Sequence, residues 1–281
     1  MPEYEKRGYL PADFKVFYLK DNHLREFQYH YHEFDKVIIF LNGNVQYMIE
    51  GKSYNLAPHD IILVNHNDIH KPAIDCSVPY ERIIIYIMSG FLQKYAEGNQ
   101  DLTHCFELAK AKQMHVLRLN LHKSQELLQQ MEKLRQGLAE KSFAQALYGK
   151  LLFLEFMVLL NRALLSSPSE ASNASHYDPK TLALLAYINA NLFADLSVEA
   201  LAQKFYISKY YMMRKFKNET GYTLHQYITH KRLLLSRDFI REDQPLTKIC
   251  FDCGFKDYST FSRAFKTLFN CTPSEYKKQL P

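Results

Sequence analysis

The first hundred residues contain short apolar runs that are typical of β-strands. Three runs rich in β-branched side chains lie at 37–40, 61–64 and 83–87, and apolar side chains alternate with others over 45–50. Turn-forming Asn and Gly residues at 42–44 separate two of these runs. Several short strands with frequent turns predict a small β-sandwich or β-barrel.

After about residue 91 the apolar spacing changes to that of helices. From Leu127 to Leu138 the apolar positions are spaced four, three and four residues apart, which predicts one face of a helix over 121–138. A second, more apolar helix is expected over 143–165. Together they predict a helical hairpin. It packs on the β-domain or pairs with a second copy of the chain, and the spacing favours neither.

Residues 166–176 read SSPSEASNASH, a composition typical of a flexible linker. Beyond this linker the pattern is helical throughout, with capping residues such as Ser197, Ser208 and Asp257 before the helices. Gly221 and Gly254 are the expected helix ends. The expected helices cover 181–192, 198–205, 209–220, 224–241, 246–253, 258–269 and a last one from 273.

The charge is distributed unevenly along the chain. Residues 178–281 hold 16 Lys and Arg against 10 Asp and Glu, whereas the first 177 residues hold 19 against 20. The whole excess of the formal net charge of +5 therefore belongs to the last third of the chain. Such an asymmetry indicates a nucleic acid or an anionic membrane as partner.

Composition argues against several classes of protein. The most apolar stretch, 151–160, is interrupted by Glu155 and is too short for a bilayer span, so we expect no membrane segment. The five Cys are an odd number and are scattered, which argues against a disulfide framework. The first residues lack the apolar core of a signal peptide. We therefore expect a cytoplasmic protein.

The basic segment repeats itself at an offset of 48 to 49 residues. The matched pairs are Leu201 with Ile249, Ala202 with Cys250, Arg214 with Arg263, Phe216 with Phe265, Lys217 with Lys266, Thr223 with Thr272, and Tyr227 with Tyr276. Each copy predicts a short helix, a tight turn and a second, basic helix, which is the arrangement of a helix-turn-helix. The helix over 224–241 would join the copies. Its 18 residues rise about 27 Å, compatible with two reading helices about one DNA turn, roughly 34 Å, apart.

These motifs closely resemble the signature of the AraC/XylS transcription regulators. The resemblance covers about a hundred residues and is carried by Ile249-Cys250-x-x-Cys253-Gly254-Phe255, Asp257-x-Ser259-x-Phe261-x-Arg263-x-Phe265-Lys266 and Thr272-Pro273-x-x-Tyr276. Two positions depart from it: Cys250 stands where the family usually has Ala, and Asn270 where it usually has Gly. Cys is small and Asn tolerates a left-handed helix end, so DNA binding is still expected.

The reading helices provide the expected DNA contacts. Arg can bind guanine O6 and N7 with two hydrogen bonds, and Lys mostly neutralises phosphate. The expected DNA-binding residues, on the exposed sides of the two helices, are Lys209, Tyr210, Met213, Arg214, Lys217, Tyr258, Ser259, Ser262, Arg263 and Lys266. The expected core residues are Phe216, Phe265, Tyr227 and Tyr276.

The N-terminal half resembles a cupin barrel, which is the sensor domain that the AraC resemblance implies. The resemblance is carried by His30-x-His32, Gly43 at the following turn, and His70. Metal-binding cupins need a carboxylate where this chain has Lys36, and a cation there opposes a divalent metal. Asp35 and Glu33 point to the other face of the strand.

We therefore expect a polar pocket for a small organic effector, without a cofactor. The expected effector-binding residues are His30, His32, Lys36, His70 and Arg82. A metal bound by His30, His32 and His70 is the weaker alternative. Cys250-x-x-Cys253 has no second Cys pair and is expected to be a pair of buried thiols rather than a zinc or redox site.

The expected fold is an α+β multidomain chain. A cupin-like effector-sensing barrel is expected over 1–105, a helical dimerisation or packing region over 106–165, a linker over 166–176 and a tandem helix-turn-helix domain over 177–281. This predicts a DNA-binding transcription regulator, by family resemblance an activator, and not an enzyme. The expected partners are double-stranded DNA, a small-molecule effector such as a sugar, a second copy of the chain and RNA polymerase, but no membrane. The alternatives are a metal-dependent cupin enzyme with a DNA-binding tail and a constitutive DNA-binding scaffold with an empty barrel.

Overall fold

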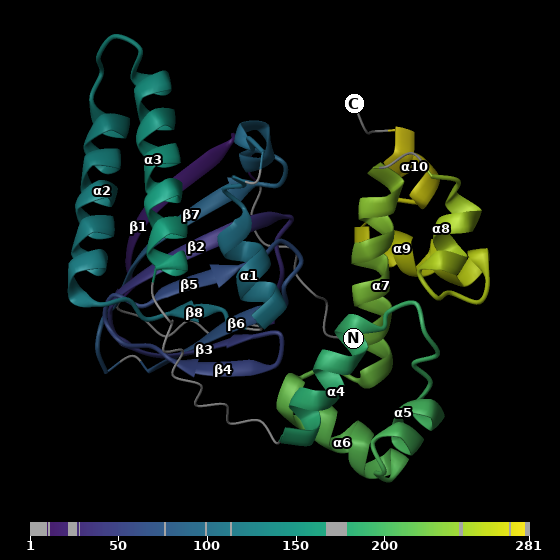
Figure 1. Cartoon of the computed structure of the whole chain (residues 1–281). Helices are drawn as coiled ribbons and strands as arrows, with labels where there is room; N and C mark the ends of the chain where they lie inside the picture. Colours follow the sequence, from purple (N-terminus) through teal and green to yellow (C-terminus); the bar gives the residue numbers. More distant parts are fainter. Residues whose placement is uncertain are drawn as a thin grey trace. The chain divides into compact units, whose positions relative to one another are not determined.

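The computed structural model of the chain describes residues 10, 12–21, 27, 29–75, 77–98, 100–112, 114–166, 179–241, 244–269 and 271–278. The chain divides into two compact units, residues 1–175 and 176–281 (Figure 1). Apart from Ser166, the predicted linker lies outside the described residues, as does Asn270. No helix in the described ranges combines the length and the apolar character needed to cross a membrane.

The first unit is built on two antiparallel sheets. The larger sheet has the strand order β1-β7-β2-β5-β8, and the smaller one β4-β3-β6. The strands are β1 (Phe14–Asp21), β2 (Phe34–Asn42), β3 (Asn44–Ile49), β4 (Lys52–Asn55), β5 (Ile61–Val64), β6 (His70–Asp75), β7 (Tyr80–Met88) and β8 (Val116–Leu117). The four apolar patterns in the sequence lie within β2, β5, β7 and β3, so the prediction of these strands is confirmed.

β2 is buried on both of its faces. Val37 and Ile39 pack with the helices of the unit, whereas Ile38 and Phe40 pack with the smaller sheet. Because successive side chains of a strand point to opposite faces, the larger sheet is the middle layer between the helices and the smaller sheet (Figure 1). Burial on both faces explains why this strand reads as a continuous apolar run.

The helices of the first unit cover one face of the larger sheet. They are the 3₁₀-helix η1 (Leu92–Tyr95), α1 (His104–Lys112), α2 (Leu121–Ala139) and α3 (Gln145–Leu165). α2 and α3 form the predicted hairpin (Figure 1). Leu127, Met131 and Leu134 of α2 lie in one core cluster with Phe153 of α3 and Val37 of β2. The hairpin therefore packs on the β-domain.

The sequence had not indicated β1, β4, β6, β8, η1 or α1. β1 pairs with β7 along its whole length. α1 follows η1, and β8 pairs with β5 through Ile61 with Leu117 and Ile62 with Val116. The larger sheet thus continues beyond residue 105, where the sequence had suggested its end.

The second unit is entirely helical in its described part. Its helices are α4 (Pro179–Ala190), α5 (Val198–Lys204), α6 (Lys209–Thr220), α7 (Leu224–Arg241), α8 (Leu246–Asp252), α9 (Tyr258–Phe269) and α10 (Pro273–Lys278). The predicted caps are present. Ser197 accepts a hydrogen bond from Ala200 N at 3.2 Å, and Asp257 accepts one from Thr260 N at 2.7 Å. Gly221 ends α6 at a φ of 77°.

Candidate functional site

Two helix pairs in the second unit share one turn geometry. In the turn between α5 and α6, Ile207 N donates to the carbonyl oxygen of Ala202 at 3.1 Å. In the turn between α8 and α9, Phe255 N donates to that of Cys250, also at 3.1 Å. These four residues are equivalent in the sequence repeat, so the repeat is a repeat of backbone structure.

The residue before each donor adopts a left-handed conformation. Gly254 has a φ of 78°, which glycine adopts readily, and Tyr206 has a φ of 52° at the equivalent position. A bulky residue at positive φ is strained, and the Tyr206 side chain is almost completely exposed.

The core of each copy is also repeated. Phe216 packs edge-to-face on Tyr227 with ring centroids 5.6 Å apart, and Phe265 packs in the same way on Tyr276 at 5.8 Å. Phe216, Phe265 and Tyr227 are buried, and Tyr276 is half-buried against the same core. The prediction that these four residues are core residues is confirmed.

α6 presents a basic and aromatic face to solvent. Its buried side consists of Met212, Phe216 and Thr220. The five side chains expected to contact DNA from this helix are all exposed: Lys209, Tyr210, Met213, Arg214 and Lys217. The Arg214 guanidinium lies 5.9 Å from the centroid of the Tyr210 ring, and Lys209 Nζ lies 2.6 Å from Glu199 Oε1.

α9 presents a narrower exposed face than the sequence indicated. Ser259, Arg263 and Lys266 are exposed, and Ser262 is half-buried. The expectation for Tyr258 was wrong in this respect: its ring packs against Phe261 at 5.8 Å and belongs to the border of the core. Burial also raises the pKa of the Tyr258 hydroxyl.

Arg232 on the connecting helix α7 holds parts of both copies. Its Nε donates to the carbonyl oxygen of Leu192 at 2.9 Å and its Nη2 to that of Ala194 at 2.8 Å, just before α5. Its Nη1 donates to the carbonyl oxygen of Gly254 at 2.8 Å, in the turn before α9. One guanidinium group therefore forms hydrogen bonds with the segment before the first copy and with the turn of the second copy.

Cys250 and Cys253 are free, fully buried thiols. Burial raises the pKa of Cys253 to about 12 and also raises that of Cys250. Thiolates are the metal-binding and nucleophilic form of cysteine, and the raised pKa values keep both residues in the thiol form at neutral pH. The prediction of buried thiols is confirmed.

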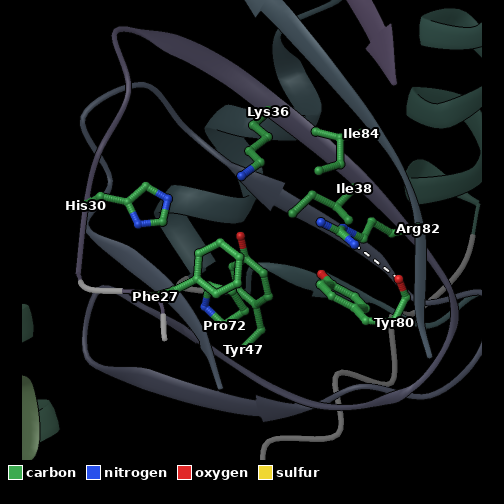
Figure 2. A pocket seen from close by; sticks show the side chains of 9 residues that line it. All are labelled: Phe27, His30, Lys36, Ile38, Tyr47, Pro72, Tyr80, Arg82 and Ile84. Atoms are coloured by element: carbon green, nitrogen blue, oxygen red, sulfur yellow. Dashed lines mark hydrogen bonds between the residues drawn. The ribbon is translucent and has the colours of Figure 1, made fainter. Parts of the chain in front are cut away.

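The first unit contains a small cavity between its two sheets. Its volume is about 40 Å³, and Figure 2 shows the side chains that converge on it. The lining residues are Phe27, His30, Lys36, Ile38, Tyr47, Pro72, Tyr80, Arg82 and Ile84. Of the expected effector-binding residues, His30, Lys36 and Arg82 line the cavity. His32 and His70 lie behind His30, with ring centroids 5.1 and 4.4 Å from its own.

The sequence contained a signal for the lining residues that were missed. Lys36 and Ile38 are two residues apart on β2, and Tyr80, Arg82 and Ile84 are spaced by two on β7. Side chains two residues apart share one face of a strand. Ile38 lies two residues after Lys36, and Tyr80 and Ile84 lie two residues before and after Arg82. The spacing of two therefore identifies these three further lining residues.

Lys36 is a buried cation on the cavity wall, with 6% of its surface exposed. Desolvation by burial, followed by the nearby Arg82 charge, lowers the pKa of its ammonium group to about 7. Its Nζ lies 5.8 Å from the centroid of the Tyr86 ring. The side chain of Asp35 points to the other face, where its Oδ1 accepts hydrogen bonds from His66 N and His66 Nδ1 at 2.7 and 2.8 Å.

Arg82 is fixed at the other side of the cavity. Its Nη2 forms an ion pair with Asp21 Oδ2 at 2.5 Å, and its Nη1 donates to the carbonyl oxygen of Tyr80 at 3.1 Å. The guanidinium carbon lies 4.0 Å from the centroid of the Tyr80 ring.

His30, His32 and His70 form a buried cluster whose nitrogen atoms lie within 4.8 Å of one another. A backbone bridge sets this arrangement, because His30 N donates to His70 O at 3.1 Å and His70 N donates to His30 O at 2.9 Å. Burial lowers the pKa of His70 well below its usual value, and the charge of Lys36 is the second largest cause of this shift. The three rings could offer nitrogens to a metal. The Lys36 ammonium opposes a divalent ion, and Asp35, the neighbouring carboxylate, bonds to His66 instead. The set fits a resident metal poorly.

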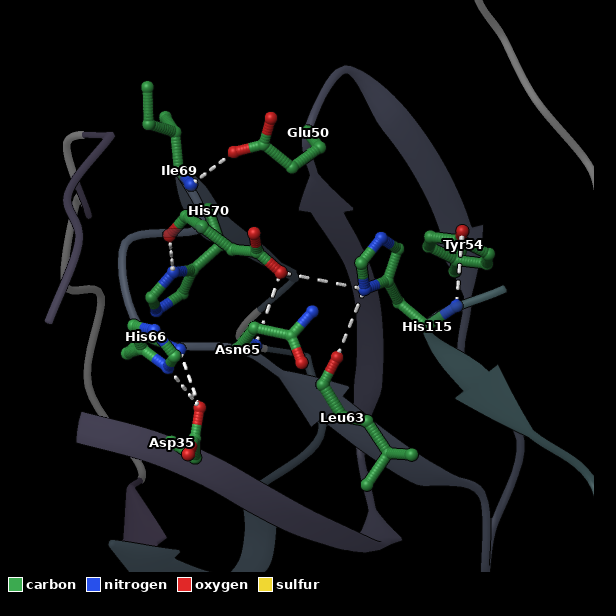
Figure 3. Close-up of polar contacts among 10 residues, drawn as sticks. Asp35, Glu50, Tyr54, Leu63, Asn65, His66, Ile69, His70 and His115 are labelled. Carbon is green, nitrogen blue, oxygen red and sulfur yellow. Dashed lines mark hydrogen bonds and ion pairs between the residues drawn. The ribbon is translucent and has the colours of Figure 1, made fainter. Parts of the chain in front are cut away.

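A hydrogen-bond network behind the cluster orients His70 (Figure 3). Its Nδ1 donates to the carbonyl oxygen of Asp68 at 2.8 Å. The Asp68 carboxylate accepts from Asn65 N at 3.1 Å and lies 3.8 Å from His115 Nδ1. Glu50 Oε1 accepts from Ile69 N at 2.6 Å. Sequence reasoning did not find this network, because it joins loops through backbone atoms.

Two family models match the chain, one in each unit. Residues 15–157 match the AraC-like ligand binding domain, and residues 201–279 match a helix-turn-helix domain. The protein is therefore a transcription regulator with a DNA-binding and a ligand-binding domain, whose partners are DNA and a small-molecule effector. The chain belongs to the AraC/XylS family. The alternative of a metal-dependent enzyme is not favoured.

Relatives cover most of the chain. The HTH-type transcriptional activators RhaS of Salmonella schwarzengrund and Salmonella typhimurium are each 26% identical over 258 residues, which is 90% of this chain and 88% of theirs. Among solved structures, ToxT from Vibrio cholerae is 16% identical over 95% of this chain and 98% of its own, with a TM-score of 0.36. The DNA-binding domain of AdpA, solved with a target DNA, is 22% identical over 36% of this chain and 92% of its own, with a TM-score of 0.35.

Proposed function

We propose that α6 and α9 read a specific DNA sequence from two successive major grooves. The observation that carries this proposal is that Arg214 and Arg263 are equivalent in the repeat and are both exposed on the second helix of their copy. The residues proposed to contact DNA are Lys209, Tyr210, Met213, Arg214, Lys217, Ser259, Ser262, Arg263 and Lys266, with Tyr258 at the edge. Binding of the full chain to the DNA upstream of its own gene, across a series of salt concentrations, tests this proposal.

We propose that the effector binds at the cavity of the first unit, through His30, Lys36 and Arg82, with His32 and His70 supporting them. The cavity has a volume of about 40 Å³, well below the roughly 300–1,000 Å³ of pockets that enclose drug-sized ligands. A sugar would therefore extend beyond the cavity or bind with a widening of it. In this proposal, the region up to β8 senses the effector and the α2–α3 hairpin forms the surface for dimerisation.

An apolar surface on the hairpin supports a homodimer. Phe143, Leu147 and Leu151 lie four residues apart and are strongly exposed, with Tyr148 beside them. Exposed apolar patches on soluble domains commonly mark interaction sites. A second copy of the chain, presenting the same patch about a twofold axis, would cover it.

We further propose that the protein activates transcription in the cytoplasm, in contact with RNA polymerase, and that it is not an enzyme. The support is that the relatives named above are transcriptional activators. The effector must bind one arrangement of the chain better than another to change DNA binding or activation.

A further inference from the structure

The charged groups on the cavity wall are all cationic or potentially cationic. Lys36, Arg82 and His30 line it, and no Asp or Glu is among the lining residues that the structure describes. Tyr47 also lines it, and burial raises the pKa of its hydroxyl well above the usual value, so this group keeps its proton. The cavity therefore offers hydrogen-bond donors and positive charge.

The positive charge of Lys36 is not balanced within the described chain. Its Nζ forms no ion pair or hydrogen bond with any described residue, although the side chain is buried. Arg82 has partners for only some of its donors. Its Nη2 forms the ion pair with Asp21 and its Nη1 donates to the Tyr80 carbonyl oxygen, but its buried Nε has no hydrogen-bond partner among the described residues. Buried charges and buried donors normally have partners, so a group that supplies the missing partners would gain binding energy.

The size of the cavity limits the chemical group that it can enclose. A volume of about 40 Å³ corresponds to roughly three water molecules at 10–15 Å³ each. A carboxylate group has three heavy atoms and a charge of −1. It offers acceptors to both an ammonium group and a guanidinium group, and charge-assisted bonds of this kind are the stronger hydrogen bonds.

We propose that the cavity binds the carboxylate group of a small organic acid between Lys36 Nζ and Arg82, and that this acid is the effector of the regulator. The inference rests on the proposed function, since it names the chemical class of the ligand at the proposed effector site. A neutral sugar would not stabilise the charged form of Lys36, whereas a carboxylate would, and a divalent metal would be repelled by that charge.

The test compares each acid with the neutral amide of the same shape, on the full-length protein. The probes are acetate with acetamide, glycolate with glycolamide and lactate with lactamide, and sodium chloride keeps the ionic strength equal. Binding is followed by ligand-observed NMR titration at millimolar concentrations. We expect at least one acid to bind about tenfold or more tightly than its amide, because bonds between charged groups are stronger than neutral ones.

The variants distinguish acid binding in the cavity from a general attraction of acids to positive charge. Lys36→Met keeps the length and the apolar stem of the side chain but removes the ammonium group, and it should abolish the preference for the acid. Lys52→Met is the matched control, because Lys52 is a half-buried lysine of the same unit that does not line the cavity. Arg82→Gln should weaken acid binding more than it weakens amide binding.

Equal binding of every acid and its amide would overturn the proposal, as would unchanged acid binding by Lys36→Met. Inorganic phosphate that binds tenfold more tightly than every acid would overturn the carboxylate assignment. Binding that requires added Zn²⁺ and is lost in His70→Ala would overturn it in favour of a metal site. DNA binding is measured on the same preparations: if it is specific while the acids fail, only this inference fails, and if it is absent, the proposed function fails.

Discussion

The guanidinium of Arg232 lies against the one position in the α8–α9 turn where a side chain has no room. Its Nη1 donates to the carbonyl oxygen of Gly254 at 2.8 Å, and a Cβ added to Gly254 would lie 2.7 Å from Arg232 Cζ. The same arginine also bonds the segment before α5. Gly254 therefore adopts its φ of 78° without the strain of a side chain and leaves room for the approach of Arg232.

Gly254→Ala should destabilise the protein by more than backbone strain alone. We expect a loss of about 2–4 kcal/mol, from left-handed strain of about 1 kcal/mol together with the clash against Arg232. Gly90→Ala is the control, since Gly90 has a φ of 85° with nothing within 4 Å of an added Cβ. It should lose only about 1 kcal/mol in urea unfolding. Equal losses of stability at the two glycines would show that the close contact with Arg232 does not add to the cost of the substitution.

Arg214→Ala and Arg263→Ala should each weaken binding to the upstream DNA by about tenfold or more. An arginine that binds guanine with two hydrogen bonds contributes about 1–3 kcal/mol of discrimination. Both side chains are exposed, so the unfolding temperature should stay nearly unchanged. Fluorescence anisotropy with labelled DNA measures the affinity, and Arg135→Ala, an exposed arginine of α2, serves as control. Normal binding by both variants would mean that α6 and α9 are not the reading helices.

Lys36→Met should stabilise the protein at neutral pH. The pKa of Lys36 is lowered from 10.5 to about 7 on folding, so the unfolded chain holds more protons between these two pH values. The Lys36 contribution to stability therefore rises with pH through this window, by up to about 1.4 kcal/mol per pH unit, and is at its least favourable below pH 7.

The variant lacks this titration. In urea unfolding, the advantage of Lys36→Met over the wild type should be largest near pH 7 and should shrink towards pH 9.5. An advantage that does not change with pH would contradict a buried, unbalanced ammonium group. Since the same lysine is proposed to bind the effector, the variant should gain stability and lose the response.

A double variant of the hairpin face, Leu147→Lys with Leu151→Lys, should be monomeric. Two added charges on each copy would face each other across a twofold interface. Leu121→Lys is the control, because Leu121 is as strongly exposed but lies at the opposite end of the α2–α3 hairpin. Sedimentation velocity should show a dimer for the wild type and the control. A dimeric double variant would place the interface elsewhere.

The sequence was sufficient for the elements that follow strong local signals. The helices of the second unit begin at capping residues and end at glycines where expected, because these signals act within a few residues. β8 escaped notice because two residues, Val116 and Leu117, have no periodicity. They form a strand only by pairing with β5, which is more than fifty residues earlier.

The lining of the cavity in the first unit was only partly predictable, for a related reason. His30, Lys36 and Arg82 were recognised from residue type, but the state of Lys36 depends on Arg82 and on burial, which come from other strands. The exposure of Tyr258 likewise depends on its packing against Phe261, which residue type alone does not indicate. Local patterns define strands and helices, whereas burial and charge balance arise from tertiary packing.

The most direct test of the whole account is the affinity of the full-length protein for the DNA upstream of its own gene, measured from low to high salt. We predict binding roughly a thousandfold or more tighter than to scrambled DNA, with log affinity falling linearly with log salt by about 0.9 per phosphate contact. Binding no tighter than to scrambled DNA, both for this segment and for fragments selected from the whole genome, would contradict the regulator proposed from α6 and α9.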